Sequence, residues 1–260
     1  MMRAAMIGFG LLCAMQVGFW LWQCRTRNAG WVDVGWAMGL ALMALLAAGL
    51  GPAPLNRRIL VALMGGLHGL RLGLHLWHRV ATEAHEDGRY QAIRAAWKTG
   101  LNAKFFLFFQ GQALLDVGLG LPFLLAAWNP RPGLHPLEWA AALLWLGAWL
   151  GESVSDAQLR RFKARPESRG RTCREGLWRY SRHPNYFFEW LVWVAYLLLA
   201  LAAPWGWTAA LCPALMLFFL LRVTGIPYTE AQSLRSRPED YASYQRETSP
   251  FIPWFPKADA

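Results

Sequence analysis

The chain has 260 residues, of which 55% are hydrophobic and only 16% are charged, and it carries 16 Trp. This composition excludes an ordinary soluble domain, which would hold fewer apolar residues and more charge. It predicts an all-α, polytopic membrane helix bundle that forms a single transmembrane domain over residues 1–260. The formal net charge of +10 does not indicate nucleic-acid binding, because Lys and Arg collect between the apolar runs, as in loops that face anionic lipid.

Seven membrane helices of about 20 residues are predicted from the apolar runs. They cover residues 4–23, 33–51, 58–80, 105–128, 136–154, 185–203 and 205–224. The first run lacks a cleavage pattern, so it is interpreted as a retained helix and not as a signal peptide. The four cysteines are scattered, which predicts neither a disulfide framework nor a zinc site.

The loops at 24–32, 79–104, 155–184 and 225–260 hold 20 of the 26 Lys and Arg residues. The positive-inside rule therefore predicts a cytoplasmic C-terminus and an external N-terminus, in a membrane that we expect to be the bacterial inner membrane. The polar segments 79–104 and 155–184 then share the cytosolic side with the tail 225–260. Any chemistry that uses them is expected there.

The third predicted helix carries a polar stripe at helical spacing, formed by His68, Arg71, His75, His78, Arg79 and Glu83. Such a stripe faces a bundle interior or a wet cavity when it lies deep in the membrane. Snorkelling would explain His78 and Arg79, which lie at the cytosolic end of this helix. No second acidic or His cluster has the spacing of a metal box, so no metal is predicted. The loop that follows, Glu86-Asp87-Gly88-Arg89-Tyr90, is either a solvated helix with local ion pairs or a lid for a polar headgroup.

The segment before residue 180 is the most basic of the chain. It contains Asp156 followed by Arg160, Arg161, Lys163, Arg165, Arg169, Arg171, Arg174 and Arg179. Two uses fit this cluster. It can face anionic lipids, or it can bind the diphosphate and ribose phosphate of a cofactor, for which Arg supplies forked donors.

The run from Tyr180 to Trp190 lies where this basic loop enters an apolar helix. Pro184 suits the first helical turn, which makes Asn185 and Glu189 neighbours on one helical face. Two polar side chains just inside a membrane indicate a ligand headgroup, unless the motif only anchors the interface.

The C-terminal segment holds Tyr-rich and Pro-rich stretches after residue 225. Its aromatic and proline-rich end is typical of an anchor that lies along the membrane surface. Tyr241 and Tyr244 share a helical face. They either stack against a planar ring or pack against the bundle.

These motifs resemble the steroid 5α-reductase family. The carrying residues are Asp156 with Arg160, the run Gly176-Leu177-Trp178-Arg179-Tyr180, residues 185–189, Arg222 and the Tyr-rich tail. The runs Glu86-Asp87-Gly88-Arg89-Tyr90 and Asp33-Val34-Gly35-Trp36 are similar to those of its bacterial membrane relatives. The last hundred positions resemble the C-terminal domain of the family, and the whole chain resembles its bacterial membrane relatives. Residues 105–260 would then be the reductase-like core, with 225–260 as a cytosolic tail.

The resemblance implies a seven-helix bundle that binds NADPH and reduces a carbon–carbon double bond conjugated to a ketone in a steroid-like or other lipophilic substrate. The chain lacks the Gly-x-Gly-x-x-Gly of a Rossmann site. It also lacks the Gln-Glu pair in the second helix and the Tyr in the third helix of the eukaryotic enzymes; His75 and His78 occupy that region instead. Besides membrane lipids and this substrate no partner is predicted, and no feature points to an oligomer.

The predicted site has two parts. The catalytic residues are Glu189, His75, Arg71 and His78, of which the stripe residues would stabilise negative charge on the substrate carbonyl. The predicted cofactor contacts are Asp156, Arg160, Arg171, Arg179, Tyr180, Arg182, His183, Asn185, Tyr186, Arg222, Tyr241, Tyr244, Arg89 and Tyr90.

Two other classes stay open. Membrane methyltransferases of the isoprenylcysteine type use S-adenosylmethionine and carry a similar Arg-His-Pro-x-Tyr. Their cofactor has no phosphates, so it requires fewer cations than this loop offers. A non-enzymatic lipid-binding protein is the third class, and it predicts that the third-helix stripe is dispensable.

Overall fold

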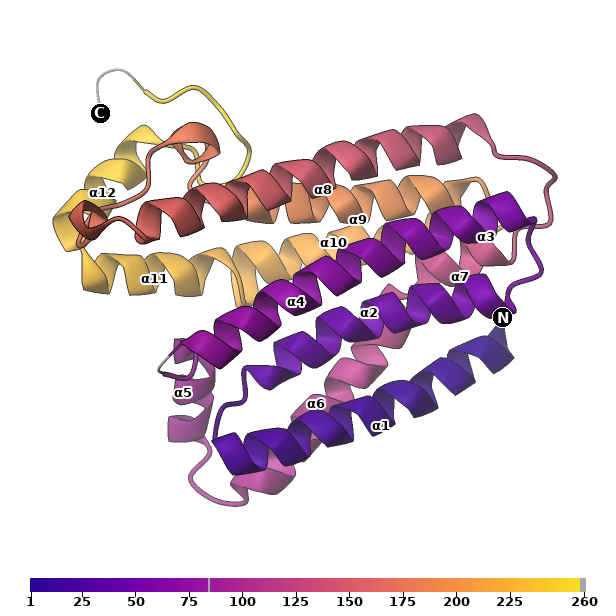
Figure 1. The fold of residues 1–260 in the computed structure, drawn as a ribbon, viewed down its shortest axis with the longest axis horizontal. Coiled ribbons are helices and arrows are strands. Elements are labelled where there is room, and N and C mark those ends of the chain that lie inside the picture. Colours follow the sequence, from indigo (N-terminus) through magenta and orange to yellow (C-terminus); the bar gives the residue numbers. More distant parts are fainter. Residues whose placement is uncertain (84, 258–260) are drawn as a thin grey trace. The chain divides into compact units, whose positions relative to one another are not determined.

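The computed structural model describes residues 1–83 and 85–257, and these residues form helices without any strand. Figure 1 shows the ribbon with its elements labelled. The helices are α1 (Met2–Thr26), α2 (Trp31–Leu50), α3 (Leu55–Val61), η1 (Ala62–Gly66), α4 (Leu67–Thr82), α5 (Gly88–Ala96), α6 (Leu101–Leu119), α7 (Leu121–Ala127), α8 (Pro136–Lys163), η2 (Pro166–Ser168), η3 (Gly176–Arg179), α9 (Pro184–Leu201), η4 (Gly206–Ala210), α10 (Leu211–Phe218), η5 (Phe219–Val223), α11 (Ile226–Ser236) and α12 (Pro238–Glu247). The predicted all-α class is confirmed.

Six helical segments in the described part of the chain are long and apolar enough to cross a membrane. They are Met2–Thr26, Trp31–Leu50, Leu55–Thr82, Leu101–Ala127, Pro184–Leu201 and Gly206–Ser236. The seventh prediction, 136–154, is also a helix, and α8 extends it to Lys163. Helix α8 is not one of the six because Glu138, Glu152 and several Trp lower the hydropathy of its apolar stretch. The protein is thus an integral membrane protein with a polytopic helix bundle.

The chain divides into two compact units, each described here by itself. Unit 1 comprises Met1–Ala142 and Tyr196–Ala209, and unit 2 comprises Leu143–Ala195 and Ala210–Ala260. The boundaries fall inside α8, α9 and η4, so each of these helices contributes to both units. The predicted reductase-like core at 105–260 stays a prediction.

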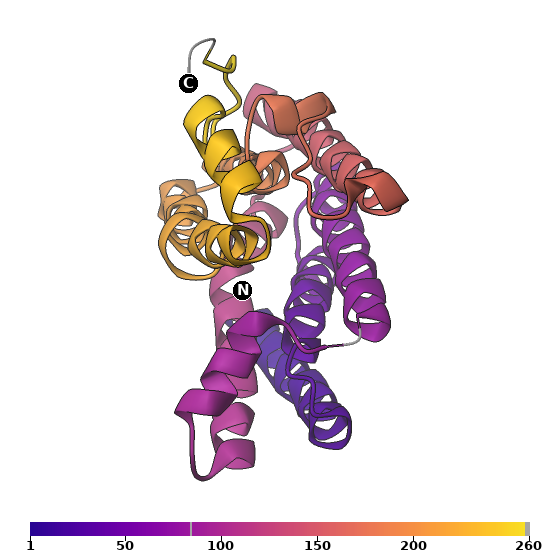
Figure 2. The ribbon, with the colours of Figure 1, turned by 90° about the vertical axis from the view of Figure 1, so that its left-hand side faces the viewer.

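Unit 1 is built around α2, which packs against α1, α4 and α6. Small residues line α2, and they let its neighbours approach closely, as is usual between membrane helices. A Cβ on Gly69 of α4 would lie 2.7 Å from the backbone oxygen of Ala37, so α4 and α2 meet nearly backbone to backbone. Helix α5 folds back beside α6 (Figure 2), where Tyr90 packs in a cluster with Phe105 and Phe109.

A buried ion pair closes one end of unit 1. The Arg57 and Glu138 side chains are both fully buried, and Arg57 Nε donates to Glu138 Oε1 at 2.5 Å. The guanidinium also donates to the carbonyl oxygens of Asn129, Arg131 and Gly133. Its charge and its donors are therefore satisfied, which a buried guanidinium requires.

The connection at residues 204–206, between the predicted helices 185–203 and 205–224, belongs to unit 1. Trp205 has a φ of 60°. A Cβ on Gly206 would lie 2.0 Å from the carbonyl oxygen of Ala200, so only glycine fits. The turn ends α9 and begins η4.

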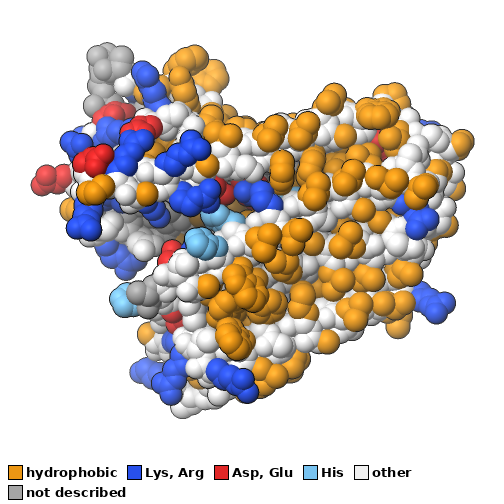
Figure 3. All heavy atoms as spheres, in the orientation of Figure 1, with side chains coloured by type: hydrophobic (Ala, Val, Ile, Leu, Met, Phe, Trp, Pro, Cys, Tyr) orange, Lys and Arg blue, Asp and Glu red, His pale blue; other side chains and the backbone are white. Residues whose placement is uncertain are grey.

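Hydrophobic and charged side chains are separated along the helices (Figure 3). Over α1, α2 and α4 of unit 1, hydrophobic side chains cover the middle, and Lys and Arg gather towards the ends. Along α8, hydrophobic side chains cover the N-terminal part, and Lys and Arg gather where the helix ends. This is the distribution of helices that cross a hydrocarbon layer.

Candidate functional site

Two pairs of polar side chains join α8 to α9 inside unit 2. Asn185 Nδ2 donates to Asp156 Oδ1 at 3.3 Å. One turn further along, carboxylate oxygens of Glu152 and Glu189 lie within 4.8 Å of each other. The predicted neighbours Asn185 and Glu189 therefore share one face of α9, and Glu152 and Asp156 share the facing side of α8.

The second pair is more buried than the first. Glu152 is 3% exposed and Glu189 is 7% exposed. Trp193 Nε1, one turn along α9, donates to Glu189 Oε1 at 2.9 Å and fixes this carboxylate. Two carboxylates this close repel each other when both are ionised. One of them therefore keeps a proton, unless a cationic group nearby offsets the repulsion.

Asn185 keeps one unused acceptor. Its Oδ1 is buried and has no hydrogen-bond partner among the described residues, whereas its Nδ2 bonds to Asp156. A buried amide oxygen without a donor costs about 1–3 kcal/mol. A ligand that donates an N–H at this position would recover that cost.

The basic residues of unit 2 divide into two groups. One group is neutralised: Arg165 pairs with Glu175, Arg174 with Glu247, and Arg182 with Glu230. The other group consists of arginines of unit 2 that were predicted to contact the cofactor. They are exposed and have no side-chain partner in the described part of the chain: Arg160, Arg171, Arg179 and Arg222. Arg222 lies in η5, a π-helical turn of a kind often found at functional sites. This second group is free to bind an anion.

The tail helices occupy several other predicted cofactor contacts. Glu230 of α11 accepts from Arg182 Nε at 2.7 Å and lies 3.3 Å from His183 Nε2. The Tyr241 hydroxyl donates to the same carboxylate. Burial lowers the pKa of His183, although its hydrogen bond to Glu230 opposes this. The predicted motif at 182–183 thus holds the tail in place.

Three predicted ring contacts are also used internally. The Tyr244 hydroxyl donates to the carbonyl oxygens of Trp178 and Ser181. Tyr186 stacks on His183 at 5.3 Å between ring centroids and bonds to Thr229. Tyr241 and Tyr244 are only 3% and 1% exposed, so neither ring face is open for a ligand. Of the two alternatives, the rings therefore pack against the protein and do not stack on a planar ligand.

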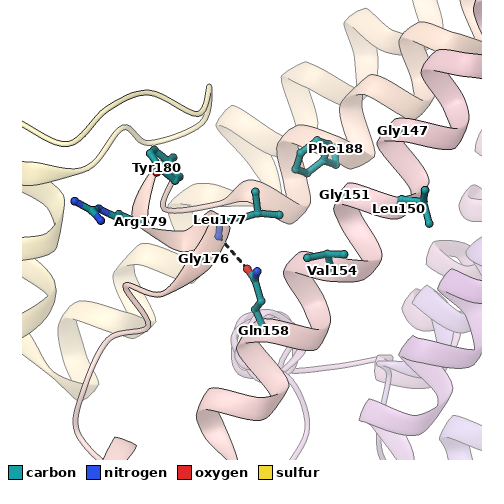
Figure 4. Close-up of a pocket in the computed structure, with 10 residues that line it drawn as sticks. All are labelled: Gly147, Leu150, Gly151, Val154, Gln158, Gly176, Leu177, Arg179, Tyr180 and Phe188. Atoms are coloured by element: carbon teal, nitrogen blue, oxygen red, sulfur yellow. Dashed lines mark hydrogen bonds between the residues drawn. The ribbon is translucent and has the colours of Figure 1, made fainter.

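A second feature of unit 2 is a groove of about 530 Å³ on α8 (Figure 4). It is lined by Gly147, Leu150, Gly151, Val154, Gln158, Gly176, Leu177, Arg179, Tyr180 and Phe188. Gln158 Oε1 accepts from the Leu177 backbone N–H at 3.0 Å and fixes η3 against α8. Gly176 has a φ of 58°, and a Cβ there would lie 2.3 Å from the Gln158 amide, so this position requires glycine.

The groove and the polar pairs lie on opposite faces of α8. An α-helix turns about 100° per residue. Positions 147, 151, 154 and 158 therefore fall on one side, whereas Glu152 and Asp156 fall on the other. The predicted cofactor contacts are divided accordingly, because Arg179 and Tyr180 line the groove and not the polar face.

The remaining predicted residues belong to unit 1. Arg71 and His75 are half-buried on α4, and His78 is exposed near its end. Their predicted action on a substrate carbonyl stays a prediction. Arg89 Nη2 donates to Asp33 at 2.8 Å, and the Tyr90 hydroxyl donates to it at 2.6 Å, so both tie α5 to α2. Burial by itself would lower the pKa of Arg89, but Asp33 and its other anionic neighbours raise it.

Sequence reasoning missed Glu152 and Gln158. Glu152 had a detectable signal, because it is an acid inside an apolar run and lies four residues before Asp156. Gln158 had none, because an amide in a basic loop is unremarkable by pattern alone.

Comparison with known proteins gives one match. No curated protein and no solved structure matches the chain. Residues 19–248 match the family described as "Protein of unknown function (DUF1295)". Because this match covers most of the sequence, the chain belongs to the DUF1295 family.

Proposed function

We propose that the protein is an NADPH-dependent integral membrane reductase that acts on a carbon–carbon double bond conjugated to a carbonyl in a lipophilic substrate. The observation that carries this proposal is the buried Asn185 Oδ1, which has no donor while its amide nitrogen is held by Asp156. A carboxamide is the complementary group, since it can donate to this oxygen. The nicotinamide of NADPH ends in such a carboxamide.

The charges of unit 2 support the same cofactor. Arg160, Arg171 and Arg222 are exposed and have no side-chain partner among the described residues, so they would hold the phosphates. NADPH, when bound, supplies the hydride that becomes attached to the β-carbon, and a proton completes the saturated ketone. Glu189 lies one turn from Asn185 on α9, and a carboxylate there would favour a ring that becomes cationic on losing hydride.

The resemblance to the 5α-reductase family agrees with this assignment, because Asp156, Asn185 and Glu189 are the positions that carry it. Its steroid specificity is not part of the proposal, since the chain lacks the family's Gln-Glu pair and third-helix Tyr. S-adenosylmethionine has no phosphate for the unpaired arginines. The methyltransferase class would be supported only if the test below showed binding of S-adenosylmethionine and not of NADPH.

The cofactor proposal is tested by binding to the detergent-purified protein. Arg160→Ala and Arg171→Ala are expected to weaken NADPH binding about tenfold, and NADH binding less, because the ribose phosphate is the added charge. Arg165→Ala is the matched control, since its guanidinium is exposed and already paired with Glu175. Binding is measured by fluorescence of the reduced nicotinamide. A protein that binds S-adenosylmethionine and not NADPH would contradict the proposal.

We also propose that the N-terminus is external and the C-terminus cytoplasmic in a bacterial inner membrane. The support is the excess of Lys and Arg in alternate loops. A reporter that is active only in the cytoplasm is expected to be active when fused after Lys257 or inserted at Gly30, and inactive when inserted at Gly133. Activity at Gly133 and none after Lys257 would reverse the orientation.

A further inference from the structure

The groove on α8 has an apolar part and a polar mouth. Leu150 and Val154 are 49% and 46% exposed although they lie in the apolar stretch of α8. Gly147 and Gly151 leave space beside them, and the Phe188 ring lies against Gly151. Gln158, Arg179 and Tyr180 line the other end of the groove, and the Arg179 side chain extends outward from its edge (Figure 4).

The mouth carries a positive charge that no described residue of unit 2 neutralises. Arg179 is exposed and has no hydrogen bond or ion pair to any described residue. The η3 turn that carries Arg179 is fixed to α8 by two hydrogen bonds. Gln158 bonds to Leu177, and Trp178 Nε1 donates to the Ser155 carbonyl oxygen at 2.9 Å. Arg guanidinium favours phosphate because its donors match two oxygens at once.

We propose that this groove binds one anionic phospholipid, with its phosphate at Arg179 and one acyl chain along Gly147, Gly151 and Val154. The groove volume of about 530 Å³ lies in the range of pockets that hold small lipophilic ligands, about 300–1,000 Å³. An apolar groove beside the exposed Leu150 and Val154, with the Arg179 guanidinium at its edge, matches a molecule with a chain and an anionic head. This site is separate from the proposed cofactor site, because it lies on the opposite face of α8 from Asp156.

The glycines allow the groove to be blocked without disturbing the fold. A Cβ on Gly147 would meet nothing within 4 Å, so Gly147→Leu adds a side chain to the groove lining without a clash at Cβ. Gly151 is unsuitable, because its Cβ would lie 2.5 Å from the Phe188 ring. Gly10→Leu is the matched control, since Gly10 of α1 is also exposed with nothing within 4 Å.

The test measures lipid retention by native mass spectrometry. The full chain is exchanged into detergent micelles that contain equal amounts of phosphatidylglycerol and phosphatidylcholine. One phosphatidylglycerol is expected to stay bound to the wild type in preference to phosphatidylcholine. Arg179→Gln is expected to lower this preference about tenfold, and Gly147→Leu is expected to lower retention of both lipids. Arg169→Gln, an exposed arginine outside the groove, and Gly10→Leu should leave retention unchanged.

Three outcomes would overturn the proposal. Equal retention by Arg179→Gln and wild type would exclude the phosphate contact. Loss in Arg179→Gln without loss in Gly147→Leu would mean a surface contact with the headgroup alone. Displacement of the lipid by millimolar inorganic phosphate would mean a simple phosphate site. NADPH binding by Gly147→Leu separates this result from the cofactor proposal, since it should equal that of the wild type.

Discussion

Arg57→Met is expected to lower the free energy of unfolding by about 3–5 kcal/mol, because it leaves the Glu138 carboxylate buried without its counter-charge. Both side chains are fully buried. The same change also removes the donors to the carbonyl oxygens of Asn129, Arg131 and Gly133. The effect is measured by equilibrium unfolding in mixed micelles of mild detergent and dodecyl sulfate, followed by tryptophan fluorescence.

Two comparisons identify the cause of this loss. Arg58→Met is the control, because Arg58 is only half-buried and donates to Ala48 and Gly49 at the end of α2. We expect it to cost much less. The double variant Arg57→Met with Glu138→Leu should regain most of the lost stability, since it leaves no unpaired charge. A double variant as unstable as Arg57→Met would show that shape, and not charge, decides stability at this position.

Asn185→Leu is expected to slow reduction more than it weakens NADPH binding. Leucine removes both the bond to Asp156 and the free acceptor Oδ1, so a carboxamide in the site loses its partner. The expected loss is about tenfold to a hundredfold in rate, which corresponds to about 1–3 kcal/mol. The measurement is single-turnover oxidation of bound NADPH with a lipophilic enone. Glu189→Gln should act in the same direction because it removes negative charge.

The control for this prediction is Asn102→Leu, the same substitution at an exposed position of α6. Thermal unfolding is measured for each variant. If Asn185→Leu turns over at the wild-type rate, the reaction takes place elsewhere. If its rate falls only in proportion to its stability, Asn185 has a structural role between α8 and α9, and the interpretation of its motif as a helix-entry anchor is correct.

Much of the fold could be predicted from the sequence, because membrane helices depend mainly on local composition. A run of about 20 apolar residues must form a helix in hydrocarbon, where no water can satisfy the backbone. The predicted runs 4–23 and 33–51 are therefore α1 and α2 with small boundary shifts. The position of Asn185 and Glu189 on one face of α9 was likewise predictable, since residues four apart always share a helical face.

The contacts between distant segments could not be predicted in this way. Helical spacing shows that Tyr241 and Tyr244 share a face, but it does not show what covers that face. The structure covers it with Glu230, with the backbone near Trp178 and with the rest of the tail. Likewise, nothing local indicates that Arg89 and Tyr90 both bond to Asp33, because this contact spans more than fifty residues.

The sequence by itself determined that this is a helical membrane protein with a basic loop before Asn185. Only the tertiary structure decided which of those basic residues remain available to a ligand. Arg160 and Arg182 look alike in a list of charges, yet Glu230 neutralises Arg182, and Arg160 has no partner in the described part of the chain. The physical reason is that a cation's role depends on which anion the fold places beside it, and that anion can lie anywhere in the sequence.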